Sequence, residues 1–196
     1  VNIDDSDTVY GEGLLQLVGA DALAYFHSDR MIRRFVATID NLPRQEAPAG
    51  KMPVKPVGGP FLVERNSAGM TIDPANARRY VRYLEIMAAV EVRRLVDLYV
   101  GFYPVFQQAY RELGYPHGRF NDRVVDTLDD LLATPDVAPP IAVTQPKVLY
   151  EFADPALEKR SAGQKIMLRM GADNMARAKR LLSAIRSELL RRSPGK

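Results

Sequence analysis

Residues 92–113 read VRRLVDLYVGFYPVFQQAYREL, a stretch that indicates a mainly helical protein. Apolar residues recur in it every three or four positions, the spacing that gathers side chains on one face of an α-helix. Gly101 and Pro104 interrupt the pattern, and proline cannot continue the helical hydrogen-bond ladder. We therefore expect a central helix of about six turns that bends or breaks there. Its apolar face comprises Leu95, Leu98, Tyr99, Phe102, Phe106, Ala109, Tyr110 and Leu113.

Further helical patterns precede this stretch. A short one begins at Tyr10 and ends near Gly19. A clearer one places Ile32, Phe35, Val36 and Ile39 on one face, and Pro43 must end that helix. Asp73-Pro74 joins an N-cap acceptor to a proline suited to the first helical position, which predicts a third helix start. The expected apolar stripe of that third helix is Tyr80, Tyr83, Leu84 and Met87.

Helix-start signals also follow the central stretch. Asn121 can cap a helix over 121–132, with Phe120 placed to staple against Val125. Asp154-Pro155 repeats the cap-plus-proline pattern, and Ser161-x-x-Gln164 has the form of a capping box. A last helix is expected from about residue 173, with leucines, an isoleucine and an alanine on one face.

Three segments do not fit a helix. Residues 43–60 hold five of the 14 prolines and predict an extended connector across the surface. Apolar runs at 61–64 and 70–72 flank a turn-forming Asn-Ser-Ala-Gly, which predicts a β-hairpin. Two short extended runs at 141–144 and 148–152 indicate a second ribbon.

These patterns predict a mainly α protein, a compact domain of about six to eight helices with one or two short β-hairpins. We expect a flexible N-terminal segment over 1–9, a single helical domain over 10–192 and a tail over 193–196. Hydrophobic residues make up 46% of the chain and charged residues 26%, so a disordered chain is excluded. The sequence begins at Val1 rather than Met, which is consistent with a trimmed or processed chain.

Composition narrows the function classes. No cysteine is present, which excludes disulfides and thiol chemistry. The net charge of +3 is weak evidence for a polyanionic partner, although 20 of the 27 basic residues are Arg, which suits bidentate binding of carboxylates or phosphates. No run approaches the roughly 18 apolar residues of a membrane span.

Motifs for catalysis are missing. Only His27 and His117 could serve as a histidine base or ligand, and they form no helix-spaced pair. No G-x-S-x-G elbow or phosphate-binding glycine loop occurs, and the neighbours Asp129 and Asp130 would point about 100° apart on a helix. We expect no catalytic residue, no metal ligand and no cofactor.

Two groups of polar residues lie where predicted elements meet. Arg33 and Arg34 precede Asp40-Asn41, and a second group comprises Lys147, Tyr150, Glu151, Gln164, Lys165 and Arg169. Buried ion pairs that lock helices together would explain both groups, and a ligand site is the alternative. The basic stretch from Arg177 to Lys196 could contact phosphates of nucleic acid or anionic lipid, although a solvated helix face explains it better.

Four longer runs carry a resemblance to a known family. They are IRRFVATIDNL (32–42), GPFLV (59–63), PKVLYEFADP (146–155) and GQKIMLRMG (163–171). Together they resemble a family of proteobacterial domains of unknown function, over most of residues 10–190. The resemblance implies an envelope protein with an N-terminal transmembrane helix, absent from this chain, and a periplasmic domain anchored to the inner membrane. A cytoplasmic location stays open, and the family supplies no catalytic residues.

The leading functional hypothesis is a non-enzymatic interaction module of the bacterial envelope that binds a protein or cell-wall component. A small-ligand or carbohydrate-binding domain, enzymatic or not, is the alternative, with Tyr and Arg around 147–169 stacking on the ligand and binding anions. Nucleic-acid binding through the C-terminal basic helix is a weaker hypothesis. Membrane association is expected only through an anchor.

Overall fold

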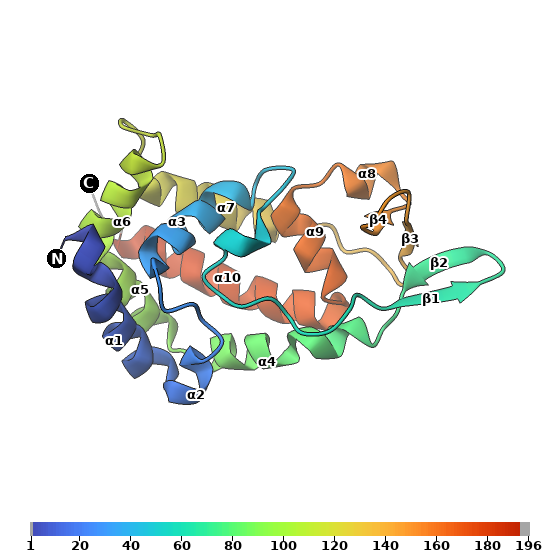
Figure 1. Cartoon of the computed structure of the whole chain (residues 1–196), viewed down its shortest axis with the longest axis horizontal. Coiled ribbons are helices and arrows are strands. Elements are labelled where there is room, and N and C mark those ends of the chain that lie inside the picture. Colours follow the sequence, from blue (N-terminus) through green and yellow to red (C-terminus); the bar gives the residue numbers. More distant parts are fainter. Residues whose placement is uncertain (1, 193–196) are drawn as a thin grey trace.

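Residues 92–113 form two helices, α5 (Val92–Gly101) and α6 (Tyr103–Glu112), in the computed structural model, which describes residues 2–192 (Figure 1). The expected break is confirmed, because Phe102 separates the helices and Pro104 lies in the first turn of α6. The buried ring of Phe106 packs on Tyr99 and on Phe120, with centroids 5.2 and 5.8 Å apart. These rings lie at the centre of the largest hydrophobic cluster.

The N-terminal helices cover one side of this cluster. They are α1 (Ser6–Val18), the one-turn α2 (Ala20–Leu23) and α3 (Met31–Asn41), which follow a short 3-10 turn over Ile3–Asp5. Ile32 and Val36 of α3 are buried as its spacing predicted.

The flexible segment expected over 1–9 needs correction. Residues 3–9 are helical, and Ile3 and Ser6 are only 4% and 1% exposed. The polar run resembles a solvated terminus, but the Ser6 hydroxyl donates to the Ile3 carbonyl at 2.6 Å and Ile3 fills part of the core. Val1 and the expected tail 193–196 lie outside the described residues.

The Pro-rich connector leads from α3 to the first β-hairpin and contains one 3-10 turn, Ala49–Lys51. Helix α4 (Asn76–Ala89) follows that hairpin. One face of α4 differs from the expected stripe, because Ile86 is buried whereas Met87 is exposed. Leu84 is buried as expected, in a second core cluster with methionines from α9 (Ala162–Arg169) and α10 (Ala172–Arg192).

The long helix α10 packs against α4, α5 and α7 (Phe120–Leu132). The expected Asn121 cap is wrong, because α7 begins one residue earlier and Asn121 is buried inside it. Phe120 is drawn into the aromatic core instead of stapling the helix start, and its backbone N–H donates to the Gln107 side chain at 2.8 Å.

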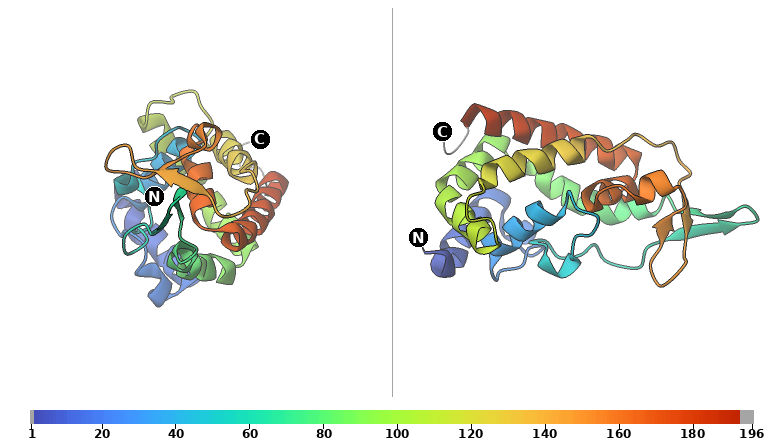
Figure 2. Two further views of the ribbon diagram at one scale, coloured as in Figure 1. Left: turned by 90° about the vertical axis from the view of Figure 1, so that its right-hand side faces the viewer. Right: turned by 90° about the horizontal axis from the view of Figure 1, so that it is seen from above.

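The two expected hairpins join into one antiparallel sheet of order β1-β2-β3-β4 at one end of the molecule (Figures 1 and 2). Its strands are β1 (Val63–Asn66), β2 (Gly69–Ile72), β3 (Ala142–Thr144) and β4 (Glu151–Phe152). β2 pairs with β3 through Met70 opposite Val143, which links the hairpins. Phe152 packs on Leu157 of the one-turn α8 (Pro155–Glu158) and on Leu168 of α9.

The described chain is therefore mainly helical with a small antiparallel sheet, as the sequence predicted. The two described chain ends lie at the opposite end of the elongated molecule from the β1–β2 hairpin (Figure 1). In Figure 2 that hairpin extends beyond the helices along the long axis.

Candidate functional site

The first predicted polar group does not form one site. Arg34 binds the Asp29 carboxylate at 3.0 Å and donates to the Gly50 carbonyl at 2.8 Å, which ties α3 to the connector. Arg33 pairs instead with Glu112 at 3.2 Å, so the two arginines point to different partners. The hydrogen bond from Arg34 lowers the pKa of Asp29.

Asp40 is the centre of a separate network that sequence analysis missed. Its buried carboxylate accepts hydrogen bonds from Arg44 at 2.9 Å and from the Tyr115 hydroxyl at 3.2 Å, and forms an ion pair with Arg123 at 3.2 Å. The charge of Asp40 raises the pKa of Arg44. The four-residue spacing of Asp40 and Arg44 could have indicated one pair, but no local pattern connects Tyr115 or Arg123 to α3. These ion pairs join α3 to α7 and to the turn after α3, through partners other than the predicted Arg33 and Arg34.

Two members of the second predicted group, Gln164 and Lys165, are also structural. The Gln164 side chain donates to the Asp130 carbonyl at 2.7 Å, and the Ser161 hydroxyl donates to the Asp130 carboxylate at 2.6 Å. The capping box is therefore only half formed: Ser161 accepts from the Gln164 N–H, but the Gln164 side chain binds α7 instead. Lys165 pairs with Glu158 at 3.1 Å.

The rest of that group lies at the sheet. The Arg169 guanidinium lies 4.9 Å over the Phe152 ring and donates to the Tyr150 carbonyl at 3.3 Å. Burial lowers the pKa of Arg169. The Tyr150 hydroxyl accepts from Arg65 at 3.3 Å, and its ring lies 5.6 Å from Phe61. Sequence analysis missed Arg65 and Phe61, because nothing local connects the two hairpins.

The loop between β3 and β4 presents an apolar tip, which we define as Val148 and Leu149. Their exposed fractions are 85% and 75%, the largest among the exposed large hydrophobic residues of the described chain. Sequence analysis assigned both to a strand, where one would be expected to turn inward. The loop is held by a hydrogen bond from the Gln145 amide to the Val148 carbonyl at 3.1 Å, with exposed Lys147 between them. Lone exposed apolar residues are ordinary, whereas contiguous exposed apolar surface is a common feature of interaction sites.

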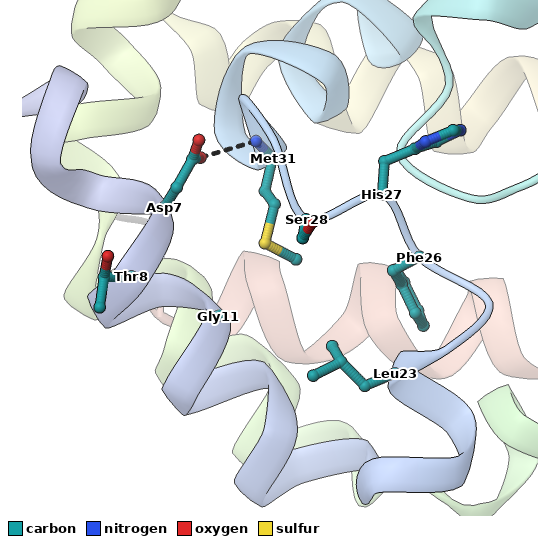
Figure 3. A pocket seen from close by; sticks show the side chains of 8 residues that line it. All are labelled: Asp7, Thr8, Gly11, Leu23, Phe26, His27, Ser28 and Met31. Atoms are coloured by element: carbon teal, nitrogen blue, oxygen red, sulfur yellow. Dashed lines mark hydrogen bonds between the residues drawn. The ribbon is translucent and has the colours of Figure 1, made fainter.

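A hollow of about 240 Å³ lies between α1 and the loop before α3 (Figure 3). Leu23, Phe26 and Met31 give it an apolar lining, and Asp7 lies at its edge. The Asp7 carboxylate accepts the Arg30 and Met31 N–H groups at 2.5 and 2.7 Å, so it caps α3. The His27 ring points away from Ser28 (Figure 3), so these side chains form no Ser-His-Asp array.

Most cations of α10 are held in ion pairs within the molecule. Lys179 binds Asp136 at 3.0 Å and Arg186 binds Asp129 at 2.5 Å. Arg191 pairs with Glu188, and Arg192 with Asp97. This pairing reduces the charge that α10 could offer to a phosphate backbone.

Residues 2–192 lack two further functional features. No group of three or more potential metal ligands occurs there. No helix among the same residues is both long enough and apolar enough to cross a membrane.

The fold and its surface define a helical domain that carries a small antiparallel sheet at one end, with an exposed apolar loop beside it. The chain belongs to the family described as protein of unknown function DUF3014, whose model matches residues 31–186. The expected membership of a family of unknown function is thereby confirmed. No curated protein and no solved structure matches the chain.

Proposed function

We propose that this domain is a non-enzymatic interaction module that binds a protein partner through its sheet end. The exposure of the apolar tip carries the proposal. Burial of a Val or Leu side chain contributes roughly 1.5–3 kcal/mol, so the pair could supply a large part of the roughly 8 kcal/mol of a micromolar complex. The held loop reduces the entropy lost on binding.

The position of the sheet supports an envelope role. The chain ends lie away from the sheet (Figure 1), so an anchor that preceded residue 2 would leave the apolar tip free. We therefore propose the periplasmic side of the inner membrane as the location, with the sheet end facing its partner.

Site-specific photocrosslinking in native envelopes tests the proposal. A photoreactive residue replaces Leu149 in the full-length protein, and a second version carries it at Val9, an exposed apolar position on α1. We expect a reproducible protein adduct from position 149 alone, identified by mass spectrometry. Identical adducts from both positions, or none from 149, would contradict the proposal.

A matched pair of double variants then measures how much the tip contributes. Val148→Ser with Leu149→Ser should lower co-purification of that partner at least tenfold, whereas Val9→Ser with Leu15→Ser should not. All four positions are exposed, so neither variant removes core packing.

Small-ligand binding is a second candidate, favoured by the apolar hollow beside α1. A Cβ at Gly11 would meet only the Met31 sulfur, at 3.6 Å, so Gly11→Leu should fill the hollow with little strain on the backbone. If the hollow binds small apolar molecules, indole should raise the unfolding temperature of the parent protein but not of Gly11→Leu. Equal responses of both proteins would remove this candidate.

A further inference from the structure

The four-stranded sheet carries its charged residues on opposite faces. Side chains opposite each other in an antiparallel sheet share a face, and successive side chains alternate between faces. The register places Arg65, Met70, Val143 and Phe152 on one side, which we call the cationic face. Val143 and Phe152 are buried, and Phe152 packs against α8 and α9, so the exposed part of this face is the end that carries Arg65. Glu64 and Thr71 lie on the other side with Thr144 and Glu151, which we call the acidic face.

One more cation reaches the cationic face, and another lies in the loop between β3 and β4. Arg169 reaches that face from α9, where its guanidinium covers the Phe152 ring. Lys147 is exposed in the loop that carries the apolar tip. The half-buried ring of Tyr150 lies beside that of Phe61, its hydroxyl accepts from Arg65, and its carbonyl accepts from Arg169. Cationic, aromatic and aliphatic groups are therefore adjacent at one end of the molecule.

These three cations differ from the ion-paired arginines of the protein in their partners. Arg34, Arg44 and Arg186 each form an ion pair with an aspartate. Within residues 2–192, by contrast, no carboxylate oxygen lies within 4.0 Å of Arg65, Lys147 or Arg169. Arg65 and Arg169 each bind one neutral oxygen of Tyr150, at 3.3 Å.

Glu158 is a candidate counter-ion for Arg169: burial lowers the pKa of that guanidinium, and the charge of Glu158 opposes this lowering in part. Its two carboxylate oxygens are already bound, one to Lys165 at 3.1 Å and the other to the Phe152 N–H at 2.8 Å. Arg169 therefore keeps hydrogen-bond donors that Glu158 does not satisfy.

From this arrangement we infer that the partner of the sheet end is an acidic protein segment whose apolar side chains cover Val148 and Leu149 while its carboxylates bind Arg65 and Lys147. The inference rests on the proposed function. Guanidinium groups bind carboxylates through paired hydrogen bonds, and complementary charge directs both encounter and orientation. The exposed Glu64 on the acidic face would repel the same segment, which favours the exposed Arg65 end of the cationic face.

Charge-reversal variants of the full-length protein test the inference, with the Leu149 photocrosslink to the partner in native envelopes as the measurement. Arg65→Glu with Lys147→Glu should lower the adduct yield at least tenfold. The matched control, Arg94→Glu with Arg180→Glu, changes the net charge by the same amount at exposed positions on α5 and α10 and should leave the yield unchanged. Glu64→Lys on the acidic face should also leave it unchanged.

The outcomes separate the inference from the proposed function. A protein adduct whose yield responds equally to both charge-reversal pairs, or to neither, would leave the interaction module standing and overturn the acidic partner. The absence of any adduct specific to position 149 would overturn both. A glycan adduct in place of a protein would also overturn the acidic protein segment. Unchanged unfolding curves of all variants would establish that none acts through loss of folding.

Discussion

Asp40 joins three parts of the chain through one carboxylate. It lies on α3, and its partners come from the turn after that helix (Arg44), the loop before α7 (Tyr115) and α7 itself (Arg123). Replacing it leaves two guanidinium groups without their counter-charge in a partly buried place.

Asp40→Asn should therefore lower the free energy of unfolding by about 2 kcal/mol. Glu112→Gln removes the partner of Arg33 at a far more exposed site and should cost at most about 1 kcal/mol. Urea unfolding of both variants measures the difference. Equal losses would show that Asp40 acts no differently from a surface ion pair.

Buried tyrosines set the response to alkaline pH. Burial raises the pKa of Tyr10 and of Tyr99 above the ordinary value of 10.0. A group whose pKa is higher in the folded state stabilises fully below its unfolded pKa, and that stability is lost as pH rises toward the folded value.

The free energy of unfolding should thus fall above about pH 10, by up to about 1.4 kcal/mol per pH unit for each of these tyrosines. Tyr10→Phe with Tyr99→Phe should flatten this slope, because phenylalanine does not ionise. Denaturant unfolding between pH 9 and 11 measures it. An unchanged slope in the double variant would assign the alkaline response to other groups.

At the scale of the element, sequence signals succeeded where the cause was local. Pro104 breaks the long helical pattern, and Asp154 caps α8 by accepting the Ala156 N–H. The signals failed where a distant element competed for the same group. Asn121 could have capped α7, but Phe120 packs in the core and the helix begins at that residue. The Gln164 amide could have completed a capping box, but it donates to the Asp130 carbonyl instead.

The approach of α9 to α3 and α7 depends on Gly163. A Cβ added there would lie 2.6 Å from a Leu131 methyl carbon and 3.2 Å from the Leu42 carbonyl oxygen, which already accepts the Gly163 N–H. Gly163→Ala should therefore destabilise the protein by about 1–3 kcal/mol through overpacking.

Gly101 provides the matched control for this prediction. It lies at the end of α5 with nothing within 4 Å of an added Cβ, so Gly101→Ala should stabilise the protein by up to about 1 kcal/mol. Thermal unfolding of both variants compares them. A stable Gly163→Ala protein would mean that the α9 contact can relax at little cost.

At the scale of the whole molecule, sequence analysis identified both hairpins but not the sheet that they form. The Met70–Val143 pairing joins strands more than 70 residues apart in the sequence. No local pattern in either hairpin indicates that it pairs with the other. Arg65 and Tyr150 are also far apart in the sequence, so their hydrogen bond could not be predicted. Of the candidate surface, only the β3–β4 part was therefore predicted. The exposure of the apolar tip was not predicted, because a short apolar run indicates a buried strand as readily as an exposed loop.

The N-terminal residues contribute to the same long-range packing. Ile3 lies in the largest core cluster, and Asp7 caps α3 from a position 24 residues away. Burial of an isoleucine contributes roughly 1.5–3 kcal/mol and a helix cap about 1 kcal/mol. A chain that begins at residue 10 should therefore lose about 2–4 kcal/mol of unfolding free energy.

Urea unfolding of that shortened chain, beside Ile3→Ser and Asp7→Ala in the parent, measures this loss and divides it between core packing and capping. If the segment were flexible, as its polar composition indicated, neither the truncation nor the point variants would shift the transition. Because Ile3 packs into the cluster that also holds α5, α6 and α7 residues, we expect the transition to move as one cooperative step.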